Sequence, residues 1–181
     1  MDYKDKTSCH TFIKKIPEGD DRLRDVCETC GFINYVNPKV VVGAVSDWKS
    51  EILLVKRAIE PRKGFWTIPA GYLEAGETIY EGAVRETWEE ANARISIDCI
   101  LGIYNIPRIS QIYIVFRAKM LSSEYFPGDE SQDAKLVSWN NIPWDELAFP
   151  SVTWALKHYH KALGFNNLVP EREPASFFWE T

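Results

Sequence analysis

The stretch from Ala70 to Ile95, AGYLEAGETIYEGAVRETWEEANARI, places a glycine-bearing loop directly before a segment rich in carboxylates. From Glu77 to Ala91 the chain has no proline, and its small and apolar residues follow a helical spacing, which predicts a helix packed on one side. In this helix Glu86 lies one turn from Glu89 and Glu90, so the three side chains converge on one patch. Carboxylates this close repel one another unless a cation is present. The patch is therefore either a solvated charged face or a site for a hard divalent ion.

The loop before the helix favours the ion site over the solvated face. Glu74 and Glu77 add acidic groups at the same end of the helix, and Arg85 can brace one or two of the carboxylates. Gly71 and Gly76 bracket the loop, and glycine permits tight backbone geometry beside a ligand.

The rest of the chain predicts a mixed fold of strands and helices. A hydrophobic content of 45% in 181 residues is enough for one core of ordinary size. The order is a small ribbon followed by mixed strands and two helices, which favours an α/β or α+β sandwich. Strands are expected at 39–46, 51–57, 66–68, 95–106, 111–119 and 134–139, and the second helix at 151–163.

The carboxylate helix resembles a known motif. Gly71, five residues, Glu77, seven residues and then the run from Arg85 to Glu90 (RETWEE) is similar to the Nudix box, Gx5Ex7REUxEExGU. The sequence departs from the box at Asn92, where the family usually has glycine. Because asparagine tolerates left-handed backbone better than other non-glycine residues, we expect the helix to end there normally.

This resemblance implies a fold, a metal site and a reaction. The fold would be α/β, a Nudix α/β/α sandwich with a mixed sheet. Mg²⁺ or Mn²⁺ would be held by Glu86, Glu89 and Glu90, together with a backbone carbonyl near Ala70, and Arg85 would orient these ligands as part of the catalytic set. The reaction would be metal-assisted hydrolysis of a nucleoside diphosphate linked to another moiety.

The general base and the substrate contacts are less fixed by the motif. In the family the base is a box glutamate, here Glu86, or a carboxylate from a later loop, for which Glu130 and Asp133 are candidates. An ordinary surface role remains open for both later acids. Arg57 is a candidate for pairing with phosphates, and Trp66 and Tyr104 for packing against a base, although aromatic residues also commonly form cores.

The amino-terminal residues 1–36 hold little hydrophobic volume and require a staple to fold. Cys27, two residues, Cys30 and a glycine resemble a zinc knuckle, and Cys9 is the obvious further ligand. A metal-free ribbon remains the alternative. The junction at 35–39, YVNPK, is similar to the one that follows a zinc ribbon in some Nudix hydrolases. The resulting division is a zinc-ribbon-like segment at 1–36, a Nudix domain at 37–165 and a tail at 166–181.

The overall layout resembles the Nudix subgroup that cleaves FAD or ADP-ribose, and these are the expected small-molecule substrates. Hydrolysis of NADH or NAD-capped RNA is the enzymatic alternative, and a non-catalytic nucleotide sensor is the alternative of another class. A net charge of −5 with no basic stripe argues against general nucleic-acid binding. No run of about 18 apolar residues occurs, so a cytoplasmic protein without membrane contact is expected. The family resemblance also favours a homodimer.

Overall fold

The computed structural model describes residues 11–164 and 169–173, and the chain divides into two compact units between Asn37 and Pro38. The smaller unit is a three-stranded antiparallel sheet in the order β1-β2-β3. A tight turn follows β2, because Gly31 adopts a left-handed φ of 73° and the Cys27 N–H donates to the Phe32 carbonyl over 2.8 Å. The strands are β1 (Phe12–Lys15), β2 (Arg24–Cys27) and β3 (Ile33–Asn34).

The larger unit is built on a mixed sheet in the order β10-β5-β4-β9-β8. The central strand β4 runs parallel to β9, and the other pairs of neighbouring strands are antiparallel. The short strands β6 and β7 pair with β5 and β4. The elements are β4 (Lys39–Trp48), β5 (Glu51–Arg57), β6 (Trp66–Thr67), β7 (Ala70–Tyr72), β8 (Ile95–Ile106), β9 (Gln111–Met120) and β10 (Ser131–Val137), with 3-10 turns at Pro107–Ile109, Trp139–Asn141 and Trp144–Glu146.

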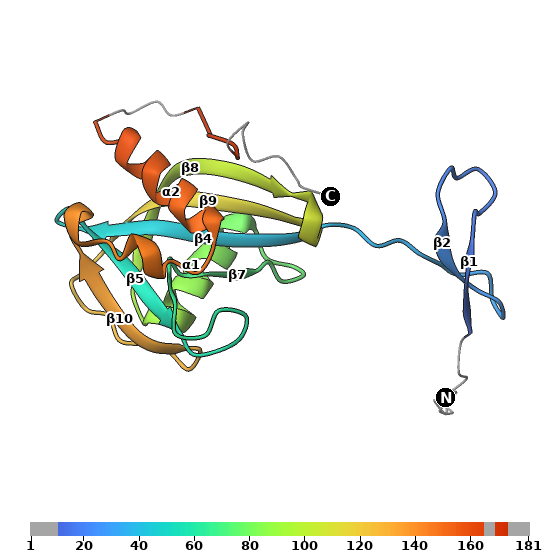
Figure 1. Cartoon of the computed structure of the whole chain (residues 1–181), viewed down its shortest axis with the longest axis horizontal. Helices are drawn as coiled ribbons and strands as arrows, with labels where there is room; N and C mark the ends of the chain where they lie inside the picture. Colours follow the sequence, from blue (N-terminus) through green and yellow to red (C-terminus); the bar gives the residue numbers. More distant parts are fainter. Residues whose placement is uncertain (1–10, 165–168, 174–181) are drawn as a thin grey trace. The chain divides into compact units, whose positions relative to one another are not determined.

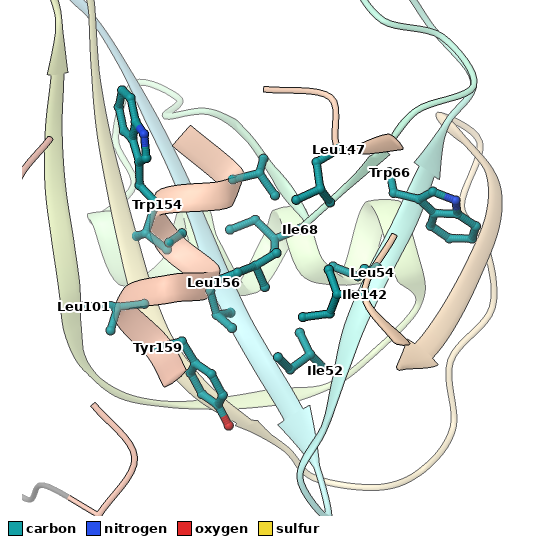
Figure 2. Packing of buried hydrophobic residues seen from close by; sticks show 14 of the residues in the cluster. Ile52, Leu54, Trp66, Ile68, Leu101, Ile142, Leu147, Trp154, Leu156 and Tyr159 are labelled. Atoms are coloured by element: carbon teal, nitrogen blue, oxygen red, sulfur yellow. The ribbon is translucent and has the colours of Figure 1, made fainter. Parts of the chain in front are cut away.

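Two helices cover opposite faces of this sheet, α1 (Ile79–Ala91) and α2 (Pro150–Lys161) (Figure 1). Successive residues of a strand face opposite sides. In β5, Ile52 and Leu54 accordingly pack in the hydrophobic cluster that contains α2, whereas Leu53 and Val55 pack in the cluster that contains α1. Figure 2 shows the α2 cluster. The arrangement confirms the predicted α/β/α sandwich. Among the described helices, none is long and apolar enough to span a membrane.

Helix α1 begins and ends at residues whose side chains favour those positions. Thr78 is the N-cap, its hydroxyl accepts from the Glu81 N–H over 3.2 Å, and the Glu81 carboxylate accepts from the Thr78 N–H over 2.8 Å. This capping box starts the helix two residues after Glu77, where the sequence pattern placed its beginning. Asn92 ends the helix with φ 48° and ψ 27°, which confirms the expected left-handed exit.

Candidate active site

A cavity of about 980 Å³ opens on the larger unit. Its lining includes the carboxylate face of α1, the adjoining strand β7 and the loop before β10. The connection between β8 and β9 and the start of α2 also contribute to the lining. The residues on its wall include Arg57, Ala70, Gly71, Tyr72, Arg85, Glu86, Glu89, Glu90, Asn92, Arg108, Tyr113, Gly128, Glu130, Phe149 and Trp154.

Two of the box carboxylates are buried in this wall. Glu86 is 8% exposed and Glu90 is 7% exposed, whereas Glu89 is exposed. Burial raises the pKa of both buried groups, and raises that of Glu90 to about 8 although its Oε2 accepts from the Ala70 N–H over 3.0 Å. The charge of Glu130 raises the pKa of Glu86 and of Glu90 further. The site therefore concentrates negative charge that the protein neutralises only in part.

The partial neutralisation comes from Arg85, whose guanidinium lies among the carboxylates. Its Nη1 donates to Glu86 Oε1 over 2.6 Å and to Glu89 Oε2 over 2.9 Å. Its Nη2 donates to Glu77 Oε1 over 2.6 Å and to the Tyr72 carbonyl over 3.0 Å. The hydrogen bonding of Arg85 to Glu77 lowers the pKa of the Glu77 carboxyl group to about 2. Arg85 thus links the acidic side chains to the backbone of strand β7.

The backbone of β7 approaches the carboxylates at Gly71. A Cβ added at Gly71 would lie 2.3 Å from Oε2 of Glu86, far inside van der Waals contact. Any side chain at this position would therefore displace the Glu86 carboxylate. The backbone at Gly71 therefore has the tight geometry expected beside a ligand. It places Ala70 and Gly71 next to the acidic patch.

The donor set fits a hard divalent cation. Carboxylate oxygens of Glu86, Glu89 and Glu90 and the backbone of Ala70 lie on one wall, and Mg²⁺ and Mn²⁺ prefer oxygen ligands. The raised pKa values of two of these carboxylates show that added positive charge would stabilise their ionised forms. Within the described ranges, no three acidic, histidine or cysteine side chains are grouped closely enough to hold a metal ion as they stand. Arg85 bonds to two of the box carboxylates, Glu86 and Glu89.

Other predicted residues divide between the cavity wall and positions away from it. Glu130 lies on the wall, whereas Asp133 does not, and the Asp133 carboxylate instead accepts from the Ala134 N–H. Arg57 also lies on the wall, where its guanidinium stands 5.3 Å from the centroid of the Phe149 ring. Of the two later-loop acids, only Glu130 is therefore placed to act on a bound substrate.

The structure places Trp66 and Tyr104, the candidates for packing against a base, away from the cavity wall. Both are buried in the α2 cluster and neither lines the cavity. The Tyr104 hydroxyl is 2.8 Å from Nδ1 of His158, and the Trp66 ring packs beneath Lys135, whose ammonium is 3.9 Å from the ring centroid. The sequence shows that both residues are aromatic, but it does not show which layer of the sandwich encloses each of them.

Two aromatic residues that the sequence did not single out line the cavity, although they too belong to the buried α2 cluster. Tyr113 of β9 and Trp154 of α2 line it, and burial raises the pKa of Tyr113 well above its usual range. The alternation of side chains along β9 places Tyr113 on an inward face of the sheet. This alternation is the sequence signal that could have identified Tyr113. Nothing local marks Trp154, because its place depends on how α2 docks on the sheet.

In the smaller unit, Cys27 is buried at the end of β2 and Cys30 is exposed in the turn that follows. The Gly31 N–H donates to the Cys27 carbonyl over 2.9 Å, which closes the turn between the two thiols. This compact CxxC turn suits a zinc knuckle. The third predicted ligand, Cys9, lies outside the described residues.

Comparisons with known families agree with this fold and site. A model described as the NUDIX domain matches residues 37–162, and a model described as Nudix N-terminal, a zinc ribbon, matches residues 8–36. The chain therefore belongs to the Nudix family and is a hydrolase of the class that acts on phosphorus-containing acid anhydrides.

Individual relatives refine this assignment. An ADP-ribose pyrophosphatase from Methanocaldococcus jannaschii is 36% identical over 119 residues, which cover 64% of this chain and 69% of that protein. The NAD-capped RNA hydrolase NudC from Pseudomonas aeruginosa is 30% identical over 122 residues, which cover 65% of this chain but only 42% of NudC. The crystal structure of a NUDIX hydrolase from Nitrosomonas europaea superposes with a TM-score of 0.86 at 43% identity, over 92% of this chain and 95% of that one.

Proposed function

We propose that this protein hydrolyses the diphosphate of ADP-ribose or FAD in a reaction that depends on Mg²⁺ or Mn²⁺. The observation that carries the proposal is the cavity of about 980 Å³ that has the box carboxylates on its wall, with Glu130 and Arg57 beside them. A volume near the upper end for small-molecule sites suits a ligand with two nucleoside-sized ends. The similarity to an ADP-ribose pyrophosphatase favours ADP-ribose of the two.

The acidic residues on the cavity wall have two roles in this reaction, metal binding and proton transfer. Glu86, Glu89 and Glu90 would hold the divalent ion with a carbonyl near Ala70, and the ion would lower the pKa of the attacking water and neutralise charge on the diphosphate. Glu130 accepts a proton from that water while the water oxygen bonds to phosphorus and the bridging phosphorus–oxygen bond breaks. ADP-ribose then yields AMP and ribose 5-phosphate, and FAD yields AMP and FMN.

Arg57 and Arg108 provide positive charge on the cavity wall. Charge-assisted hydrogen bonds from guanidinium groups suit the phosphate oxygens that remain after the carboxylates are neutralised. Tyr72 and Phe149 offer ring faces to the parts of the substrate beyond the diphosphate, in place of the buried Trp66 and Tyr104.

The test is to incubate the full chain with ADP-ribose, FAD or NADH, each with Mg²⁺, with Mn²⁺ or with EDTA, and to quantify AMP. We expect turnover of ADP-ribose or FAD with either metal, none with EDTA, and a large loss in a Glu90→Gln variant. NADH is included because of the similarity to NudC. Binding of a nucleotide without any turnover would instead identify a sensor and contradict the proposal.

We further propose that the ribbon holds a structural Zn²⁺ through Cys27 and Cys30 with Cys9. The closed turn between Cys27 and Cys30 supports this, as does the match to the Nudix N-terminal model. Elemental analysis of the purified chain should find zinc, and a Cys30→Ser variant should lose it. Zinc equal in the two proteins would contradict the assignment.

Two expectations about the whole protein also remain proposals, a homodimer in solution and a location in the cytoplasm. Light scattering on the purified chain and fractionation of the source cells test them separately.

A further inference from the structure

The loop between β9 and β10 is tied to the carboxyl end of helix α1 by three hydrogen bonds. The Phe126 N–H donates to the Ala91 carbonyl over 2.8 Å, and the Gly128 N–H donates to the Glu90 carbonyl over 2.9 Å. In return, Nδ2 of Asn92 donates to the Phe126 carbonyl over 3.2 Å. The last carbonyls of a helix have no partner within the helix, so the loop supplies donors that the helix itself lacks. We refer to these three bonds as the clasp.

Two of the residues in the clasp are of the type that its geometry requires. Asn92 occupies the box position where the family pattern has glycine; it adopts the same left-handed conformation, with φ 48°, and its amide adds a donor that glycine lacks. Gly128 lies so close to the helix that an added Cβ would be 1.7 Å from the Glu89 carbonyl oxygen. A side chain at Gly128 would force the loop away from α1.

The clasp lies immediately before Glu130 in the chain. The Ser131 N–H donates to the Gly128 carbonyl over 3.0 Å, which makes the intervening residues a turn. On the other side of that turn, the Glu130 carbonyl accepts from the Ala58 N–H over 2.8 Å. The backbone of Glu130 is therefore held between α1 and the end of β5. Glu130 lines the same cavity as Glu86, Glu89 and Glu90.

We propose that Asn92 and Gly128 are positioning residues. They hold Glu130 at the place in the cavity where it can accept a proton from the attacking water. This inference rests on the proposed function, because Glu130 serves there as the general base. The same helix that carries the box carboxylates also anchors the loop of the base. A shift of the loop would therefore change the distance between the base and the bound water.

The test compares kcat and KM for ADP-ribose with Mg²⁺ in the wild type and in Asn92→Gly. This change keeps the left-handed exit, since glycine adopts it readily, and removes the side chain that carries the Nδ2 donor. We expect kcat to fall on the order of 10-fold with KM within about twofold, because a misplaced catalytic group costs rate rather than substrate affinity. Lys49→Gly is the matched control, as Lys49 is an exposed residue with φ 49° in the hairpin between β4 and β5, and it should retain the kcat of the wild type.

The same substitution in a Glu130→Gln background shows whether the clasp acts through Glu130. Loss of a general base lowers the rate by about 10²–10⁴, which leaves a residual turnover that a high enzyme concentration makes measurable. We expect Asn92→Gly to cost nothing further in this background. An equal loss of kcat in both backgrounds, a wild-type kcat in Asn92→Gly, or a wild-type kcat in Glu130→Gln would each overturn the proposal.

Hydrogen exchange tests the clasp without reference to activity. In Asn92→Gly the amides of Phe126 and Gly128 should exchange on the order of 10-fold faster, while those in the interior of α1 keep their protection. Unchanged exchange at both amides would overturn the clasp even in an active enzyme. Gly128→Ala should release the same two amides by steric exclusion. A failure of the proposed function would appear differently, as an absence of turnover in the wild type with the exchange result intact.

Discussion

At Gly71 the backbone and the Glu86 carboxylate occupy adjoining space, and a single methyl group would fill it. The added Cβ would meet both carboxylate oxygens and the carboxyl carbon of Glu86 within 2.3–2.4 Å. Glu86 is 8% exposed and lines the cavity, so its carboxylate would have to move to accommodate the methyl group. The position thus couples the shape of strand β7 to the placement of the Glu86 carboxylate, one of the proposed metal ligands.

We predict that Gly71→Ala lowers kcat for ADP-ribose on the order of 100-fold, because the displaced carboxylate no longer holds the divalent ion in place. The thermal midpoint should change by only a few degrees, since the methyl group lies at the wall of an open cavity and not within a hydrophobic cluster. Steady-state kinetics and a thermal melt check the two parts. A variant with the activity of the wild type would show that Glu86 is not a ligand in the working enzyme.

At the scale of elements, the contact between α2 and β8 contains a titratable pair. Nδ1 of His158 is 2.8 Å from the Tyr104 hydroxyl, and burial lowers the pKa of His158 below its usual 6.5. The charge of Lys161 lowers this pKa too, whereas that of Glu171 opposes the shift. The folded protein therefore favours the neutral imidazole in this contact.

A lowered pKa in the folded state has a defined effect on stability. The stabilisation is present above pH 6.5 and is lost as the pH falls through the lower folded pKa, because the unfolded chain binds the proton more readily. We predict that the free energy of unfolding, measured by urea titration, decreases over this window. The decrease should be smaller in His158→Gln. His160→Gln is the matched control, as His160 is exposed and stacks on Trp139, and the same pH slope in all three proteins would contradict the assignment.

The first turn of α1 provides a second test at this scale. Thr78 and Glu81 satisfy two backbone donors reciprocally, and the helix they start carries Glu86, Glu89 and Glu90. We predict that Thr78→Ala destabilises the protein by about 1 kcal/mol. Thr78→Ser keeps the hydroxyl and should cost much less. Urea unfolding of the two variants measures the difference, and equal stabilities would show that the cap contributes nothing.

For the whole molecule, local sequence patterns predicted the helices and strands well. They predicted poorly which side chains are buried in the core. The box offsets identified the carboxylates and the exit at Asn92 because helical spacing and backbone conformation are local properties. The burial of Trp66 and Tyr104 depends instead on where α2 packs against the sheet, which no segment determines by itself. The loop that carries Glu130 was similarly visible only as a turn, since its bonds to α1 join residues more than thirty positions apart.

The larger unit has a hydrophobic interior of its own. Among the described residues, its two hydrophobic clusters consist of residues between Val40 and Ala162. The cavity is lined entirely by residues from Val41 onward. We therefore predict that a chain beginning at Asn37 folds alone, with a thermal midpoint within a few degrees of that of the full chain and with the same kcat for ADP-ribose.

Circular dichroism, a thermal melt and the AMP assay on this fragment check the prediction. Zinc should be absent from the fragment, while its response to Mg²⁺ and EDTA matches that of the full chain. A folded fragment with reduced kcat would show that the ribbon contributes to the site, for example by arranging a second copy of the chain. An unfolded fragment would show that the larger unit depends on the ribbon for stability, although it has a hydrophobic interior of its own, and would contradict the prediction.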